Sequence, residues 1–204
     1  MTRRLQNKIE YEKLLEYITD SLIQKGIKAL TMDSLAVSLQ MSKRTLYEIF
    51  GSKENMIEEA LKNFHERQAG FHKKTFESSD NIMEAMVKSL LATRQMMSHA
   101  SVDFFRDMES YFNDKPNKRE IEEFKFVAIE KLFRLGEEQG FFRKGLNARV
   151  QWRILLIQME SLKNMEELFP PDITLLEVYD SICLGFLRAI SSEKGLKYLD
   201  SVEI

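Results

Sequence analysis

One stretch, residues 31–53, constrains the fold of this chain more than any other. It begins with a hydroxyl that can cap a helix, followed by apolar residues at helical spacing: Thr31, then Met32, Leu35, Ala36 and Leu39. After a short turn, Ser42 can cap a second helix, whose apolar side is Leu46, Ile49 and Phe50. Two helices this short bury too little surface to fold alone, so the stretch requires further helices packed around it.

The second of these helices carries groups that suit nucleic acid. Off its apolar side lie two cations, a hydroxyl and a phenol: Lys43, Arg44, Thr45 and Tyr47. Side chains of these kinds contact phosphates and base edges in protein–DNA complexes. The stretch therefore predicts a helix-turn-helix in which residues 42–49 form the recognition helix.

The same stretch resembles the DNA-binding signature of tetracycline-repressor (TetR) type regulators. The pattern SxxTLYxxFxSKE is present as Ser42, Thr45, Leu46, Tyr47, Phe50, Ser52, Lys53 and Glu54, with Met56 at the final apolar position. The resemblance implies an all-α protein of about nine helices. A three-helix helix-turn-helix DNA-binding domain would occupy residues 1–52, and a helical ligand-binding and dimerisation domain would occupy residues 53–204.

Composition and charge agree with this fold. Three Pro and eight Gly in 204 residues, with few β-branched runs, favour long helices over sheets. Residues 1–53 hold nine Lys or Arg against six Asp or Glu, a net charge of +3, which leaves −5 for the remainder. The basic excess lies with the helix-turn-helix, as a DNA-facing end requires.

Two positions depart from the family pattern. Gln40 stands in the turn where the family usually has Gly, and a non-Gly residue with positive φ costs about 1 kcal/mol. Glu48 and Ile49 stand where many members have an aromatic or His pair. A carboxylate there repels phosphate, although Glu can accept a hydrogen bond from cytosine N4.

The predicted DNA contacts follow from the chemistry of each side chain. Arg44 and Lys43 are predicted to contact bases, since Arg can bind guanine through two hydrogen bonds. Other predicted DNA-binding residues, mostly for phosphate, are Thr31, Ser42, Thr45, Tyr47 and Lys53. A two-fold dimer would bind a palindromic site.

Apolar stripes predict helices at 8–25, 53–76, 81–98, 101–112, 117–139, 147–168 and 174–191. The last two are apolar on more than one face, which indicates a second buried side. In a TetR-like layout that side is the partner subunit, so helices 147–168 and 174–191 are predicted to form a homodimer. The alternative is that both are central core helices of a monomer.

The middle of the chain is rich in soft and aromatic side chains that line adaptable pockets or fill cores. The resemblance implies an apolar small-molecule ligand there. The predicted ligand-binding residues are Met96, Phe104, Phe105, Met108, Phe112, Phe126, Phe133, Trp152 and Met159. Polar groups that would orient the ligand are Arg94, Gln95, Gln158 and Glu160.

Other classes of site find little support in the sequence. His65 and His72 are seven residues apart, whereas metal ligands on one helix are three or four apart, so no metal or other cofactor is predicted. No nucleophile or acid–base constellation indicates an enzyme. The single Cys183 fits a buried structural thiol in a reducing cytoplasm. No apolar run approaches the ~18 residues of a membrane span, and no signal peptide follows Arg3 and Arg4.

The resemblance therefore implies a cytoplasmic, ligand-responsive regulator, by family habit a repressor, that binds an operator in double-stranded DNA. Two alternatives remain open at this stage. One is a helical interaction module that has kept the fold but lost specific DNA binding, for which Gln40 and Glu48 are the best arguments. The other is a small helical enzyme that uses the aromatic-rich middle of the chain.

Overall fold

The computed structural model describes residues 3–112 and 118–202, with side chains described for residues 10–108 and 126–202. Regular structure in the described ranges is helical, apart from one isolated antiparallel bridge between Phe142 and Ser191. This confirms the predicted all-α fold. No helix among the described residues is long and apolar enough to cross a bilayer.

The chain divides into two compact units. The N-terminal unit comprises residues 1–71 and 99–108, and the C-terminal unit comprises residues 72–98 and 109–204. The sequence predicts a DNA-binding domain that ends at residue 52. This domain limit differs from the division into two compact units, and it stays a prediction.

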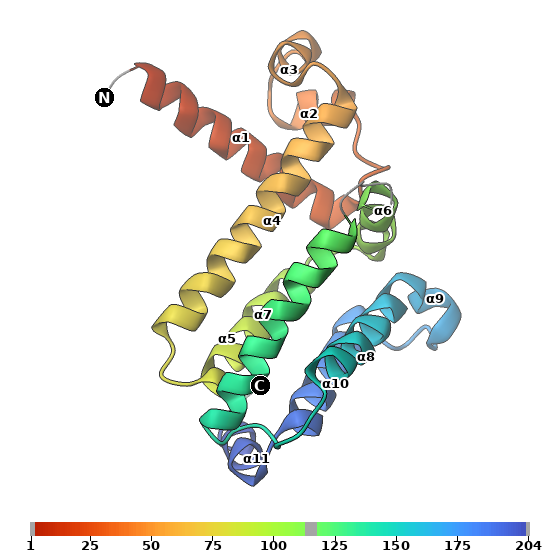
Figure 1. Cartoon of the computed structure of the whole chain (residues 1–204). Coiled ribbons are helices and arrows are strands. Elements are labelled where there is room, and N and C mark those ends of the chain that lie inside the picture. The colour runs from red at the N-terminus through yellow and green to blue at the C-terminus, as the bar shows by residue number, and fades with distance from the viewer. Residues whose placement is uncertain (1–2, 113–117, 203–204) are drawn as a thin grey trace. The chain divides into compact units, whose positions relative to one another are not determined.

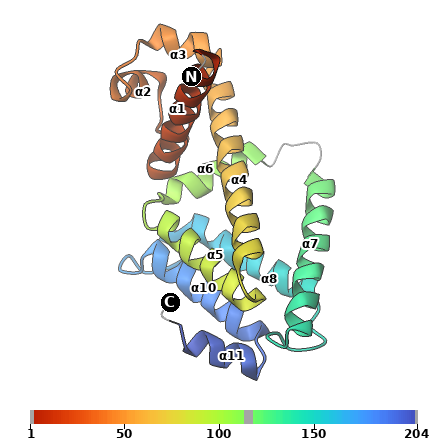
Figure 2. The same ribbon diagram turned by 90° about the vertical axis from the view of Figure 1, so that its left-hand side faces the viewer.

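The N-terminal unit contains α1 (Arg3–Lys25), α2 (Met32–Ser38), α3 (Lys43–Phe50), most of α4 (Lys53–Ser78) and the start of α6 (Val102–Phe112). Figures 1 and 2 show α3 beside the start of α4, and α2 packs against α3. Its core is formed by fully buried residues from several helices: Ile18, Leu22, Leu35, Leu46, Met56 and Ile57. Burial of these side chains supplies the support that α2 and α3 lack by themselves.

Short polar contacts fix where the helices of this unit begin and end. Thr31 and Ser34 form a reciprocal capping box at the start of α2. Gly26, with φ of 84°, ends α1, and a Cβ at this position would lie 2.9 Å from the Cβ of Asp103. The backbone amide of Ser101 donates a hydrogen bond of 2.9 Å to the carbonyl of Ile23. The chain therefore returns to α1 at the start of α6, which the sequence pattern did not reveal.

The turn between α2 and α3 has the conformation predicted for it. Gln40 has a φ of 52°, the one positive φ at a non-Gly residue among those described. Its backbone amide donates to the carbonyl of Val37, and the amide of Met41 donates to that of Ala36. These bonds close the end of α2 while leaving Gln40 in the left-handed region.

Replacing Gln40 with Gly is expected to stabilise the protein by about 1 kcal/mol, because Gly has no Cβ to strain this conformation. Urea unfolding followed by circular dichroism measures the change. As a matched control, Gly51 has a φ of 76°, so Gly51→Ala should shift the midpoint in the opposite direction. A Gln40→Gly variant that is less stable than the parent would contradict this account of the turn.

The C-terminal unit contains most of the remaining helices: α5 (Ile82–Met97), α7 (Lys118–Glu138), α8 (Ala148–Glu160), a 3-10 turn η1 (Ser161–Asn164), α9 (Met165–Leu168), α10 (Leu175–Ile190) and α11 (Glu193–Asp200). In Figures 1 and 2, α8 and α10 run side by side. Side-chain caps begin four of these helices: Asn81, Asn147, Thr174 and Ser192.

The prediction of one continuous helix over residues 147–168 is wrong. The structure ends α8 at Glu160 and continues as a 3-10 turn and the short α9. The hydroxyl of Ser161 donates a hydrogen bond of 2.7 Å to the carbonyl of Gln158, and Asn164 leaves the helical region with φ −113° and ψ 32°. Short polar side chains that bond to nearby backbone favour such breaks.

The aromatic pair after α7 fills a gap between helices. Phe141 and Phe142 are buried in the core of the C-terminal unit, and Phe142 lies 5.5 Å from Phe133 between ring centroids. The ring of Phe142 covers Gly136 on α7 so closely that a Cβ there would lie 2.1 Å from its Cδ2 atom. The absence of a side chain at Gly136 therefore admits the ring.

Candidate nucleic-acid interface and cavity of the C-terminal unit

Helix α3 presents a polar face because its apolar side is anchored in the N-terminal unit. Leu46 and Phe50 are buried, at 0% and 4% exposure. The hydroxyl of Ser42 caps the helix by accepting a 3.0 Å hydrogen bond from the Thr45 amide. Residues 43, 44 and 47 are exposed as a result. The predicted recognition-helix side chains are thus brought together on one accessible surface.

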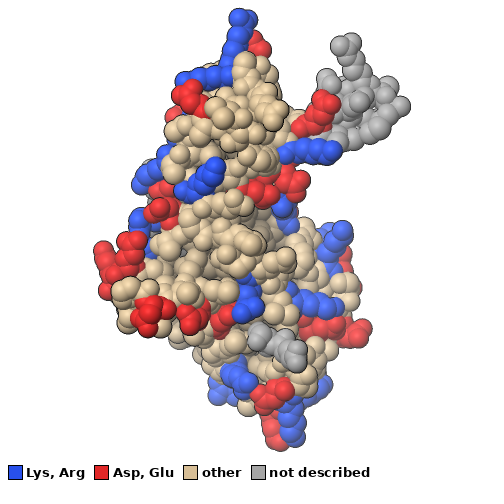
Figure 3. All heavy atoms as spheres, turned by 180° about the vertical axis from the view of Figure 1, so that it is seen from behind, with Lys and Arg blue, Asp and Glu red and all other residues tan. Residues whose placement is uncertain are grey.

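Both cations on this face are held by carboxylates. Lys43 Nζ lies 2.9 Å from Asp33 Oδ1, and the hydrogen bond that it donates to Asp33 raises the pKa of Lys43. Arg44 Nε lies 2.9 Å from Glu48 Oε1, with the two side chains 88% and 61% exposed. Figure 3 shows basic and acidic side chains close together at the top of the view, where α3 lies in Figure 1.

Exposed ion pairs of this kind contribute only about 0–1 kcal/mol, so another anion can displace either carboxylate. The Arg44–Glu48 pair has the i, i+4 spacing that a sequence can reveal. The Lys43–Asp33 pair joins α3 to α2 and depends on the tertiary fold. Sequence reasoning identified the cations but neither partner.

The remaining predicted DNA contacts lie at helix starts. Thr31 caps α2, and its hydroxyl accepts a hydrogen bond from the Ser34 amide. Lys53 is the first residue of α4, next to Ser52, whose hydroxyl accepts from the Asn55 amide. Such positions present backbone amides and suit phosphate. Sequence reasoning missed Val37 of α2, an apolar side chain that is 80% exposed.

A second feature is a cavity of about 210 Å³ between helices of the C-terminal unit, which is partly open to solvent. Helices α5 and α10 form most of its wall, through Met86, Ser89, Leu90, Thr93, Tyr179, Cys183, Phe186 and Leu187. Helix α8 adds Trp152 and Leu155, and α4 adds His72. The spacing on α5 is that of a single helix face.

Burial controls the ionisation of the groups in this cavity. It lowers the pKa of His72, and it raises that of Cys183 to about 11 and that of Tyr179 above its ordinary value. The hydroxyl of Tyr179 donates a 3.4 Å hydrogen bond to the carbonyl of Leu90. At neutral pH all three side chains are therefore uncharged.

The nine predicted ligand-binding residues are dispersed. Trp152 lines the cavity, whereas Phe133 lies in the adjoining core and Phe126 lies beneath the guanidinium of Arg149. Met96 and Met159 are partly exposed and are not among the residues of the cavity wall.

Three of the nine belong to the N-terminal unit: Phe104, Phe105 and Met108. Phe104 is 1% exposed and packs edge-on against Phe64, with ring centroids 5.7 Å apart. Phe112 lies outside the residues whose side chains are described. The sequence analysis did not identify the polar cavity residues Ser89 and Thr93. Their helical spacing from Met86 and Leu90 places all four residues on one face of α5, and this spacing could have indicated them.

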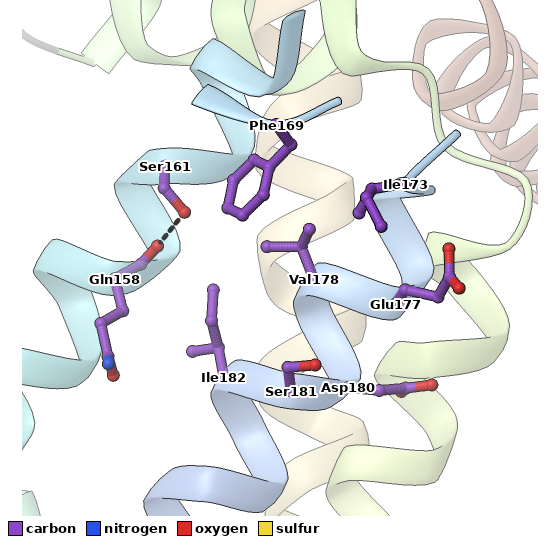
Figure 4. Close-up of a pocket in the computed structure, with 9 residues that line it drawn as sticks. All are labelled: Gln158, Ser161, Phe169, Ile173, Glu177, Val178, Asp180, Ser181 and Ile182. Atoms are coloured by element: carbon purple, nitrogen blue, oxygen red, sulfur yellow. Dashed lines mark hydrogen bonds between the residues drawn. The ribbon is translucent and has the colours of Figure 1, made fainter. Parts of the chain in front are cut away.

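A broader, open hollow of about 800 Å³ lies where α8 and η1 meet the start of α10. Figure 4 shows Phe169, Ile173, Val178 and Ile182 around it, with the Ser161–Gln158 hydrogen bond at one side. Beyond it, α8 carries exposed apolar residues at i, i+4 and i+7: Val150, Ile154 and Ile157, at 49%, 46% and 57% exposure. Helix α10 carries the small exposed residues Ser181, Gly185 and Ala189.

Comparison with known proteins agrees with this geometry. The model of the tetR family of bacterial regulatory proteins matches residues 14–60, which include α2 and α3. The HTH-type transcriptional repressor KstR2 of Mycolicibacterium smegmatis is 24% identical over 155 residues, which cover 71% of this chain and 73% of that protein.

Solved structures show the same fold over most of the chain. The ketosteroid transcriptional regulator KstR2 of Mycobacterium tuberculosis has a TM-score of 0.60 at 22% identity, covering 89% of this chain and 94% of that one. The transcriptional regulator FadR of Bacillus subtilis, in complex with stearoyl-CoA, has a TM-score of 0.55 at 13% identity, covering 88% and 99%. These matches place the helix-turn-helix of residues 14–60 in the tetR family of bacterial regulatory proteins, and they show that the chain has the helical fold of such regulators over most of its length.

Proposed function

We propose that this regulator is a repressor that binds a palindromic operator as a homodimer and responds to a small molecule bound in its C-terminal unit. The observation that carries the proposal is the polar face of α3, where Lys43, Arg44 and Tyr47 project from a helix anchored by Leu46 and Phe50. Repression is the activity named for KstR2. In this chain it stays part of the proposal.

On DNA, Arg44 would exchange its bond to Glu48 for the edge of a guanine, where two hydrogen bonds are available. Lys43 would exchange Asp33 for a phosphate or a base. The released Glu48 would either repel the nearest phosphate or accept a hydrogen bond from cytosine. Glu48 therefore influences both affinity and sequence preference.

Selection of random duplex DNA by the purified protein tests this proposal. The parent should recover a palindrome, and Arg44→Ala should lose about 1–3 kcal/mol of discrimination at one position of each half-site. Glu48→Gln should bind all duplexes more tightly, because the carboxylate that competes for Arg44 and repels phosphate is gone. A base contact by Arg44 predicts that Arg44→Ala changes the sequence preference at a single base pair. A general charge effect would instead weaken binding to all sequences alike.

The control for this experiment is Lys62→Ala, which removes an exposed cation of α4 that is paired with Glu66 at i, i+4. It should leave the selected sequence unchanged. No enrichment of any sequence by the parent at low salt would instead support a helical interaction module that has kept the fold without specific DNA binding.

The exposed faces of α8 and α10 support the proposed dimer. An apolar stripe on α8 beside small residues on α10 offers a surface on which another pair of helices can pack closely. A two-fold arrangement would place the same residues opposite each other and make a four-helix interface. The proposed interface on the α8 side ends near Glu160, since the continuous helix to residue 168 is absent.

Replacing Ile154 with Asp is expected to weaken dimerisation by about 100-fold or more, because an unpaired charge would be buried in the interface. Sedimentation equilibrium measures the dissociation constant. Leu91, which is 37% exposed on α5, provides the matched control, and Leu91→Asp should leave the constant unchanged. Equal behaviour of the two variants would exclude the α8 face from the interface.

The response to ligand would act through α4. This helix begins at Lys53, directly after the helix-turn-helix, and carries His72 of the cavity wall. A ligand that binds one orientation of α4 more tightly than another would shift the population toward it and change the separation of the two recognition helices.

A further inference from the structure

The cavity of the C-terminal unit has walls that limit the size and polarity of an occupant. Its apolar lining comes mainly from Met86, Leu90, Trp152, Leu155, Phe186 and Leu187. Its volume of about 210 Å³ is below the ~300–1,000 Å³ of pockets that take drug-sized ligands. The part of a ligand that lies in this space without rearrangement is therefore compact, and most of its surface is apolar.

One side of the cavity is polar. Ser89 and Thr93 lie one turn apart on α5, and Ser89 Oγ is 3.2 Å from His72 Nδ1. Thr93 donates to the carbonyl of Ser89 at 3.0 Å, and Tyr179 donates to that of Leu90. Tyr179 also has side-chain hydrogen bonds with Thr93 and Cys183. Each hydroxyl oxygen has two lone pairs, so it can accept one further hydrogen bond beside these contacts. The Ser89–His72 pair can supply either a donor or an acceptor.

The cavity wall also selects against charge. Among the lining residues that the structure describes, none is Lys, Arg, Asp or Glu. Burial keeps His72 and Cys183 in their neutral forms at pH 7. An ion that entered would lose part of its hydration without meeting an opposite charge on these residues, which disfavours binding.

We propose that this cavity binds a compact, uncharged molecule that has an apolar body and one hydroxyl group. The body would lie against Trp152 and Phe186, and the hydroxyl would lie against Ser89, Thr93 and Tyr179. A hydroxyl both donates and accepts, so it matches this polar side better than an amine or a carboxylate does. The inference rests on the ligand-responsive function proposed above, and it adds the chemical class of the ligand.

Four probes of similar size test the proposal: benzyl alcohol, ethylbenzene, benzylamine and benzoate. Trp152 is the single Trp of the chain and lines the cavity, so its fluorescence reports occupancy. Benzyl alcohol should give a saturable change in emission and raise the melting temperature. Its affinity should exceed that of ethylbenzene by about fivefold, the effect of one hydrogen bond. Benzylamine and benzoate should bind at least tenfold more weakly than benzyl alcohol.

Conservative variants locate the hydroxyl. Ser89→Ala and Tyr179→Phe each remove one oxygen from the polar side, so at least one of them should abolish the preference for benzyl alcohol over ethylbenzene. Ser98→Ala is the matched control, because that hydroxyl donates to the carbonyl of Gln95 at the exposed end of α5. Equal or tighter binding of a charged probe would overturn the proposal. So would the absence of any response to benzyl alcohol, or a preference that survives both variants.

Operator binding measured with the same probes separates this inference from the proposed function. If benzyl alcohol binds with the expected selectivity while DNA affinity is unchanged, the ligand class stands and the proposed response to ligand fails. If DNA affinity changes only with the charged probes, the ligand class is overturned and the response stands.

Discussion

Replacing Gly136 with Ala is expected to destabilise the protein by about 2 kcal/mol or more, although Ala is favoured over Gly in a helix by about 1 kcal/mol. The added Cβ would lie 2.1 Å from Cδ2 and 2.4 Å from Cε2 of Phe142, whereas carbon atoms pack at ~3.5–4.0 Å. Phe142 is 2% exposed and packed against Phe133, so its ring cannot move aside without disturbing the core. The steric clash therefore outweighs the helix propensity.

Thermal unfolding followed by circular dichroism measures this effect, and a fall of roughly 4–8 °C is expected for a chain of this size. Gly70→Ala is the matched control, because nothing lies within 4 Å of a Cβ at that position of α4. It should raise the melting temperature slightly. The double variant Gly136→Ala, Phe142→Leu should recover part of the loss. If the two Gly→Ala variants behaved alike, the close contact between Gly136 and Phe142 would be absent in solution.

Replacing Asp107 with Ala is expected to cost about 2 kcal/mol, chiefly because a backbone amide loses its partner. Asp107 is 4% exposed, and its Oδ2 accepts a 2.9 Å hydrogen bond from the Lys28 amide. Its Oδ1 also lies 3.0 Å from Lys28 Nζ, but the lysine side chain is 77% exposed. An ion pair with so exposed a lysine contributes little. The hydrogen bond to the backbone is therefore the larger contribution.

Two further variants separate these contributions. Asp107→Asn keeps an acceptor for the Lys28 amide and should lose less than ~1 kcal/mol. Lys28→Ala removes the ammonium alone and should change stability by less than ~0.5 kcal/mol. Urea unfolding ranks the three, and hydrogen exchange at the Lys28 amide should accelerate most in Asp107→Ala. A loss in Lys28→Ala as large as that in Asp107→Ala would show that the ion pair dominates.

The sequence predicted best those parts of the fold that depend on residues close to one another in the sequence. Thr31, Ser42 and the positive φ of Gln40 are local features, and the structure confirms the helices and the turn that they predict. The break after Glu160 also has local causes, but the apolar stripe over residues 147–168 continues across it. Hydrophobic spacing alone therefore predicted one helix too long.

The cavity was harder to predict because large apolar residues both line pockets and fill cores. Phe104 and Phe133 proved to be core residues of different units. Space remains beside Ser89 and Thr93 because their side chains are small. Which side chains face such a space depends on how distant helices pack, as the return of the chain to Ile23 at Ser101 also shows.

The two ion pairs on α3 bear on how the protein searches a genome. Lys43 and Arg44 carry their own counter-charges, so their arrival at an arbitrary stretch of duplex releases fewer bound cations than two unpaired side chains would. Non-specific complexes are held mainly by that release. We therefore expect short residence on unrelated DNA and a search by frequent dissociation rather than long one-dimensional sliding.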